Sequence, residues 1–233
     1  MGKPEELLRD YQRARINEEA VNMEKVHFYK TDKRVNPKQE DPFWFSHGKL
    51  PILVSAPHSV RHCRHKKIKM SDQYTGSIVY LLNQLTGCHA IAVTKLYGGD
   101  PNADFPCLFK ERIAEIVRRE KVKFVLDIHG AARERDFDVD FGTDNGRTLL
   151  ARPSMLQILE RNFQAFGLSE LSNNHFAASG PNTIANFVAR ELNIPAVQVE
   201  INKQYRVPAQ NSQGFHRIIG AFVETINQIR FLW

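Results

Sequence analysis

Short apolar runs alternate along most of the chain with longer segments whose apolar residues recur at helical spacing. Continuous apolar runs, typical of strands covered on both faces, occupy residues 51–56, 88–94, 122–128 and 195–201. Helical spacing is found at residues 71–87, 109–121, 154–167, 182–192 and 213–231. This strand–helix rhythm predicts an α/β fold with a largely parallel sheet.

The first forty residues depart from this rhythm. Residues 4–24 carry an imperfect apolar stripe among many charges, which predicts a helix that begins near Pro4. Residues 24–30 alternate Val26 and Phe28 with polar neighbours, a pattern that favours an edge strand. We therefore expect residues 1–40 to form a helical extension with an edge strand, and residues 41–233 to form one domain. The extension is expected to pack on that domain or to contribute a homodimer contact.

Polar side chains of chemical interest stand where three of the predicted strands end. His58 follows residues 51–56, His129 lies at the end of residues 122–128, and Glu200 lies in residues 195–201. In open α/β sheets, sites form outside the carboxyl ends of the strands. We therefore expect these three side chains to converge.

Two histidines and nearby carboxylates are suitable ligands for a zinc ion that keeps one open coordination position. Asp72, in the first turn of a helix predicted to start at Ser71, is the candidate third ligand beside His58 and His129. His62 and His65 remain alternatives for that place. Each residue also has a structural explanation: a turn or core histidine, or an acid that stabilises a helix N-terminus.

Asp127 and Glu200 have other candidate roles. On a strand, alternate side chains share a face, so Asp127 points the same way as His129 and can orient its ring. A carboxylate within an apolar strand costs free energy to bury unless it is paired or functional. Glu200 is therefore the candidate general base.

Composition and charge disfavour several classes of protein. The 233 residues are 42% hydrophobic and 25% charged, contain no apolar run long enough to span a bilayer, and begin without a signal-peptide core. Three scattered cysteines favour reduced thiols and a cytoplasmic location. The net charge of +6 is partly concentrated in residues 61–69, which lack the interleaved aromatic residues of a nucleic-acid surface. A basic balance can mean nucleic acid, an anionic surface or a small acidic substrate. We expect neither nucleic acid nor a membrane as partner.

Five short motifs occur in order along the chain: Pro57-His58-Ser59, Asp72 ahead of an apolar helix, Leu126-Asp127-Ile128-His129, residues 138–143 and residues 197–205. Together they give the chain a resemblance to the N-formylglutamate amidohydrolase family. The resemblance covers residues 50–206 and implies a zinc carboxypeptidase-like, three-layer α/β fold, in which helices cover both faces of a mixed, mostly parallel sheet. It also implies metal ligation by His58, His129 and an acidic partner, with Glu200 as base.

The loop that commonly carries an Asn-Arg pair in this family departs from the pattern. Residues 100–104 contain Asn102, retained as a candidate substrate-binding residue, but no arginine. Arginine is the natural clamp for a carboxylate, and Arg133, just beyond His129, is the candidate replacement. Arg135, Arg61 and Arg64 are the alternatives.

The prediction is thus a metal-dependent hydrolase domain over residues 41–233 with Zn²⁺ or another divalent ion as cofactor. Metal-activated water would attack the amide of a small N-acyl amino acid such as N-formylglutamate, and Glu200 would accept the proton. One alternative is a divergent binding protein that kept the fold and lost activity. A metallophosphoesterase shares the Asp-x-His motif but needs second-metal motifs that this chain lacks. A serine nucleophile is disfavoured because no Gly-x-Ser-x-Gly elbow is present.

Overall fold

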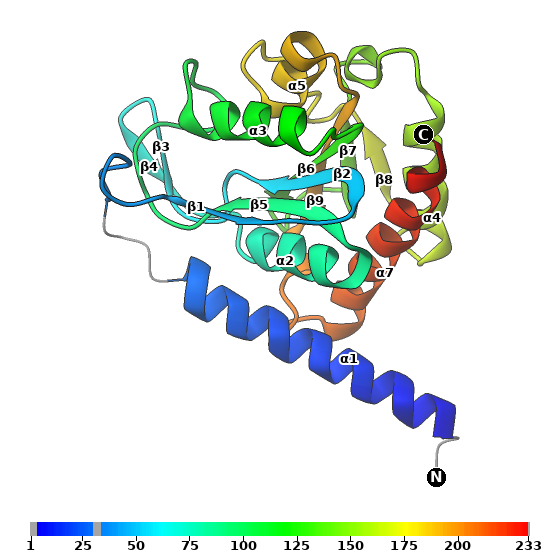
Figure 1. The fold of residues 1–233 in the computed structure, drawn as a ribbon. Helices are drawn as coiled ribbons and strands as arrows, with labels where there is room; N and C mark the ends of the chain where they lie inside the picture. The colour runs from blue at the N-terminus through cyan, green and yellow to red at the C-terminus, as the bar shows by residue number, and fades with distance from the viewer. Residues whose placement is uncertain (1–3, 30–33, 233) are drawn as a thin grey trace.

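The computed structural model describes residues 4–29 and 34–232. Its centre is a seven-stranded sheet in the order β1-β5-β2-β6-β9-β7-β8 (Figure 1). The strands are β1 Phe43–Ser46, β2 Leu50–Ala56, β5 Cys88–Val93, β6 Phe124–Ala131, β7 Val139–Gly142, β8 Leu171–Asn173 and β9 Ala196–Asn202. The four strands β5, β2, β6 and β9 run parallel, whereas β1 and β7 pair antiparallel with β5 and β9. The predicted mixed, mostly parallel sheet is confirmed.

Helices cover both faces of this sheet. Helices α3 Leu108–Arg119 and α5 Ile184–Leu192 lie on one face, and α2 Thr75–Thr86, α4 Ser154–Ala165 and α7 Ser212–Ile229 lie on the other (Figure 1). Phe163 of α4 packs edge-on against both Phe141 of β7 and Phe222 of α7, which seats these two helices on the sheet. The helix α1 Pro4–Met23 packs outside α2, and the short α6 Lys203–Arg206 follows β9. The three-layer α/β prediction is therefore confirmed.

The predicted edge strand at residues 24–30 is wrong over Glu24–Phe28, which form a π-helix, while Lys30 lies outside the described residues. Contacts with α2 override the weak sequence alternation. The carboxylate of Glu24 accepts hydrogen bonds from the Tyr74 N–H and the Ser77 hydroxyl, and the Phe28 ring lies against Gly76. The extension is thereby attached to the start of α2.

Two other details differ from the sequence prediction. Helix α2 begins at Thr75, not at Ser71, because Tyr74 adopts a left-handed conformation (φ 68°) that interrupts the helix there. Asp72 therefore lies in the turn before the helix. The basic run at residues 61–69 forms a hairpin of β3 His62–Arg64 and β4 Lys67–Lys69, and β8 lies within the predicted loop 168–181. Among the described residues, no helix is long and apolar enough to cross a membrane.

Candidate active site

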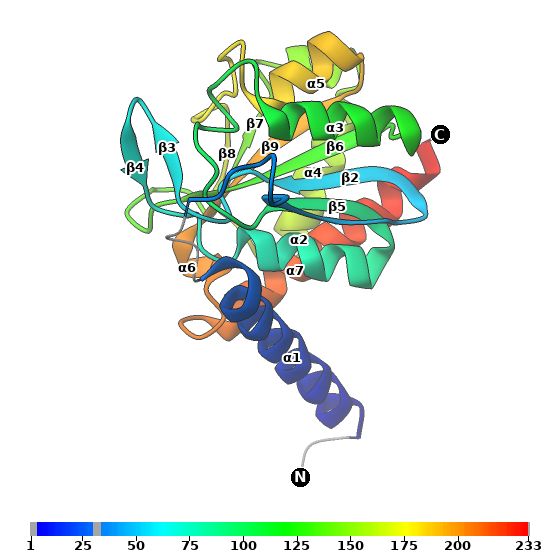
Figure 2. The same cartoon turned by 60° about the vertical axis from the view of Figure 1, so that its left-hand side comes forward.

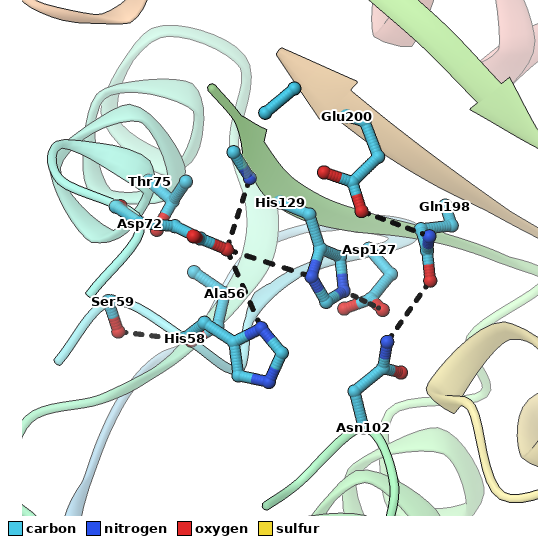
Figure 3. Close-up of polar contacts among 12 residues, drawn as sticks. Ala56, His58, Ser59, Asp72, Thr75, Asn102, Asp127, His129, Gln198 and Glu200 are labelled. Carbon is cyan, nitrogen blue, oxygen red and sulfur yellow. Dashed lines mark hydrogen bonds and ion pairs between the residues drawn. The ribbon is translucent and has the colours of Figure 1, made fainter. Parts of the chain in front are cut away.

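The sheet brings His58, His129 and Glu200 together at the carboxyl ends of three neighbouring strands (Figure 3). His129 and Glu200 are direct register partners on β6 and β9, so their side chains share one face of the sheet. His58 follows β2 by two residues. Asp72 arrives from the turn before α2, where its N–H donates to the carbonyl of His58 over 2.8 Å. The predicted convergence is therefore present.

His58, Asp72 and His129 have the geometry of a metal site. Oδ2 of Asp72 lies 3.5 Å from Nδ1 of His58 and 3.8 Å from Nδ1 of His129, and one ligand atom from each of the three lies within 4.8 Å of the others. Tetrahedral bonds of about 2.0–2.2 Å separate ligand atoms by roughly 3.3–3.6 Å. Small adjustments of the three side chains would therefore place a single ion among them.

The other nitrogen of each ring is held by a buried carboxylate. Nε2 of His129 lies 2.8 Å from Asp127, as expected, and Asp127 also accepts a 2.6 Å hydrogen bond from the Ser55 hydroxyl. Nε2 of His58 lies 2.8 Å from Asp100. These carboxylates favour a hydrogen on Nε2 and leave the Nδ1 lone pair for a metal. Sequence reasoning missed Asp100, whose only signal is its place in the long loop after β5.

Residue Asp72 is fixed to the end of β6 by the backbone and by a buried arginine. The N–H of Gly130 donates to Oδ2 of Asp72 over 3.1 Å. The guanidinium of Arg206 donates to the carbonyls of Gln73 (2.6 Å) and Ala131 (3.1 Å), which ties the turn to the strand. A side chain at position 130 would collide with this guanidinium, which explains the glycine there.

The protonation of the site follows from burial and charge. Burial lowers the pKa of His58, but its contacts with Asp100 and Asp72 outweigh this and raise the pKa to about 9. Burial opposes ionisation of Asp72, yet His58 holds the pKa of that carboxyl below its usual value. Burial also raises the pKa of Glu200 to about 7. Without metal, a proton on His58 therefore supplies the positive charge beside Asp72 that a bound cation would supply.

Glu200 is oriented by a chain of side-chain amides. Nε2 of Gln198 donates to Glu200 over 3.2 Å, and Nδ2 of Asn102 donates to the oxygen of Gln198 over 3.2 Å (Figure 3). The Asn102 oxygen accepts the Ile184 N–H at the start of α5. Asn102 lines the active-site cavity, but its amide is engaged in holding the loop against α5 and Gln198.

Lys110 of α3 holds the loop that carries Asp100 and Asn102. This lysine is fully buried, and its ammonium donates to the carbonyls of Pro101 (2.6 Å) and Asp104 (2.8 Å). One clamp thus supports both the carboxylate that orients His58 and the amide that leads to Glu200. The sequence places Lys110 on a helix but gives no sign that it would be buried.

A cavity of about 690 Å³ opens over these groups. Arg133, the predicted carboxylate clamp, does not line it, and its guanidinium donates to Gln210 instead. Arg135, Arg64 and Lys69 do line it. The loop after β6 turns Arg135 toward the cavity and Arg133 toward Gln210, ahead of α7. Two of the alternatives, Arg135 and Arg64, therefore lie at the cavity, and Arg133 does not.

The alternatives to Asp72 as third ligand are less well placed. The ring of His62 stacks on that of His58 (3.9 Å between centroids), and its Nε2 lies 3.6 Å from Asp100, on the Nε2 side of His58. His65 lies exposed in the hairpin turn. A separate group of His47, His89 and Glu120 is unsuited to a metal, because Nδ1 of His89 accepts the Gly48 N–H and its hydrogen is left on Nε2.

The fold is similar to that of solved structures that include a metallo-carboxypeptidase and a poly-gamma-glutamate hydrolase. No protein-family model matches the sequence, and no curated protein matches it either. Solved structures do match, at sequence identities that establish the fold alone.

Three of these similar structures show the extent of the likeness. A gene product of Agrobacterium tumefaciens is 10% identical with a TM-score of 0.55, covering 84% of this chain and 99% of its own. A bacteriophage poly-gamma-glutamate hydrolase is 16% identical with a TM-score of 0.51, covering 84% and 95%. A metallo-carboxypeptidase from Pseudomonas aeruginosa is 14% identical with a TM-score of 0.51, covering 94% and 68%.

Proposed function

We propose that this protein is a metal-dependent amide hydrolase that acts on an acidic N-acyl amino acid, N-formylglutamate being the compound that the sequence resemblance suggests. The observation that carries the proposal is the grouping of His58, Asp72 and His129 beside Glu200, under a cavity rimmed by cations. Similar folds in a metallo-carboxypeptidase and a poly-gamma-glutamate hydrolase support it.

The donor set suits a divalent ion, and two imidazoles with one carboxylate favour zinc. Each imidazole already has its outer nitrogen bound to a carboxylate, an arrangement that raises its basicity as a ligand. A zinc ion held by His58, Asp72 and His129 would polarise the amide carbonyl and lower the pKa of water.

Glu200 acts as the general base in this proposal. It accepts a proton from the attacking water and delivers it to the leaving nitrogen. A pKa raised by burial to about 7 suits a group that must both take and give a proton near neutral pH. The amide of Gln198 holds the carboxylate in place while it does so.

The cations at the cavity rim bind the substrate carboxylate. Arg135 and Arg64 present guanidinium groups, and Lys69 presents an ammonium. Guanidinium groups pair with carboxylates in two parallel hydrogen bonds, which fixes the substrate as well as attracting it.

The proposal is tested by measuring hydrolysis of N-formyl-L-glutamate and other N-acyl-L-glutamates with metal-free and zinc-loaded protein. We expect turnover only with metal. Glu200→Gln is expected to keep stoichiometric zinc and to lower kcat by about 10²–10⁴-fold, while the exposed control Glu191→Gln changes neither. Equal turnover without metal, or full activity of Glu200→Gln, would refute the mechanism. Substrate binding without turnover would favour a divergent binding protein of the same fold.

A further inference from the structure

Cations flank the active-site cavity on two opposite sides. The strand order places β5 and β2 on one side of β6 and β9, and β7 on the other. Arg64 belongs to the first side, because it pairs with Asp100 in the loop after β5. Arg135 belongs to the second side, because its guanidinium lies 5.0 Å from the centre of the Phe176 ring, and the Phe176 N–H donates to Asp140 of β7. The catalytic groups lie between them.

The β3–β4 hairpin turns a charged face toward the cavity, and Figure 2 shows it projecting from the body of the molecule. His62 stacks on His58, so its face of the hairpin is the inner one. Lys69 is the cross-strand partner of His62, and Arg64 lies two residues beyond it, so both share that face. Ile68, which is 56% exposed, lies on the outer face.

The charged side chains that line the cavity leave a positive charge on each side of it. Among the described lining residues, the only carboxylates are Asp72 and Glu200, which the proposed metal chemistry uses. Arg64 is already paired with Asp100, so Lys69 on one side and Arg135 on the other remain available to attract anions. The cavity volume of about 690 Å³ falls within the roughly 300–1,000 Å³ of sites that enclose drug-sized ligands.

We propose that the substrate carries an anionic group on each side of the amide that is cleaved, so that the acyl part is acidic as well as the amine part. A dicarboxylic acyl group or an acidic peptide fits this chemistry. This inference rests on the proposed hydrolase function and revises its substrate, because a formyl group has no charge to offer the second flank.

Four matched amides test the inference: N-succinyl or N-butyryl groups on either L-glutamate or glutamine α-amide. Succinyl and butyryl have the same carbon chain length and differ in the terminal carboxylate, and the two amines differ in their carboxylates. Release of succinate or butyrate by the zinc-loaded protein gives kcat/KM for each. We expect each anion to raise kcat/KM about tenfold or more, with N-succinyl-L-glutamate the best of the four.

Variants then separate the two flanks. Lys69→Gln and Arg135→Gln are each expected to abolish the increase in kcat/KM that one anionic part of the substrate gives. Each variant should keep the increase in kcat/KM that the other anionic part gives. Lys123→Gln and Arg118→Gln, at exposed positions away from the cavity, serve as matched controls that leave both increases unchanged. Calorimetry with the metal-free protein should show weaker binding of N-succinyl-L-glutamate to the same two variants.

The outcomes distinguish this inference from the hydrolase proposal. Equal hydrolysis of N-butyryl- and N-succinyl-L-glutamate would overturn the two-sided substrate and leave the hydrolase intact. The two-sided substrate would also be overturned if Lys69→Gln and Arg135→Gln both lost the increase in kcat/KM due to the same anion. Hydrolysis of none of the four amides, nor of N-formyl-L-glutamate, would overturn the hydrolase proposal and this inference with it.

Discussion

At the scale of single residues, both ring nitrogens of His58 and of His129 lie close to a carboxylate. Each Nε2 is paired with a buried carboxylate, and each Nδ1 faces Asp72. Two histidines with the same arrangement around one shared oxygen are hard to explain by packing alone. The pairs instead have the arrangement that would orient both rings toward a common ion.

The two outer carboxylates provide a residue-scale prediction. Asp100→Asn and Asp127→Asn should each weaken zinc binding by about 10–100-fold, because an amide makes the imidazole a less basic ligand than a carboxylate does. Competition with a chromophoric chelator measures the affinity. Asp136→Asn, an exposed position nearby, is the control. Unchanged affinity in both variants would show that these carboxylates only pack.

At the scale of elements, the extension completes a helix that would otherwise start without a side-chain cap. Tyr74, the N-cap residue of α2, offers none, and Glu24 accepts the hydrogen bonds from Tyr74 and Ser77 instead. Asp72 lies two residues before Tyr74. The extension therefore supports the turn that carries a predicted metal ligand, although it lies outside residues 50–206, which contain the five motifs. The predicted homodimer contact of this extension remains a prediction.

Removal of this cap is the element-scale prediction. Glu24→Ala should lower the free energy of unfolding by about 1–2 kcal/mol, as loss of a helix cap does, and should also weaken zinc binding because the turn at Asp72 loosens. Urea denaturation and chelator competition measure the two effects. Glu18→Ala, at an exposed position of α1, should change neither. Unchanged zinc affinity of the Glu24→Ala protein would show that the extension does not support the metal site.

At the scale of the whole molecule, the site links stability to pH. The pKa of His58 in the folded, metal-free protein is raised to about 9, above its ordinary value near 6.5. Its stabilising contribution is therefore complete below about pH 6.5 and is lost as the pH rises through about 9. Glu200, whose pKa is raised from about 4.5 to about 7, loses its contribution earlier, as the pH rises through about 7.

The Tm of metal-free protein should consequently fall between pH 6.5 and 9, and the increase in Tm on adding zinc should grow over the same range. Zinc takes the place of the protons, and binding to the folded state alone raises stability by mass action. Differential scanning calorimetry at constant ionic strength checks both trends. His58→Asn should flatten the fall. A metal-free Tm that rises from pH 7 to pH 9 would contradict this reading of the site.

The sequence by itself determined most of the elements and which polar side chains stand at the strand ends. Strand runs and helical spacing are local patterns, so they predicted the sheet strands near His58, His129 and Glu200 correctly. Where a strand ends is also local, and the sheet then places the ends of parallel neighbours side by side. Asp127 could be assigned to His129 because the two residues lie on one strand.

Only the tertiary structure decided which distant segments meet these strand ends. The strand order differs from the chain order, so the loop after β5 comes to lie beside β2 and delivers Asp100 to His58. No local pattern marks Glu24 as a cap or favours Arg135 over its neighbour Arg133. Such roles depend on contacts between residues far apart in the chain, and periodicity reports only which face of an element is buried.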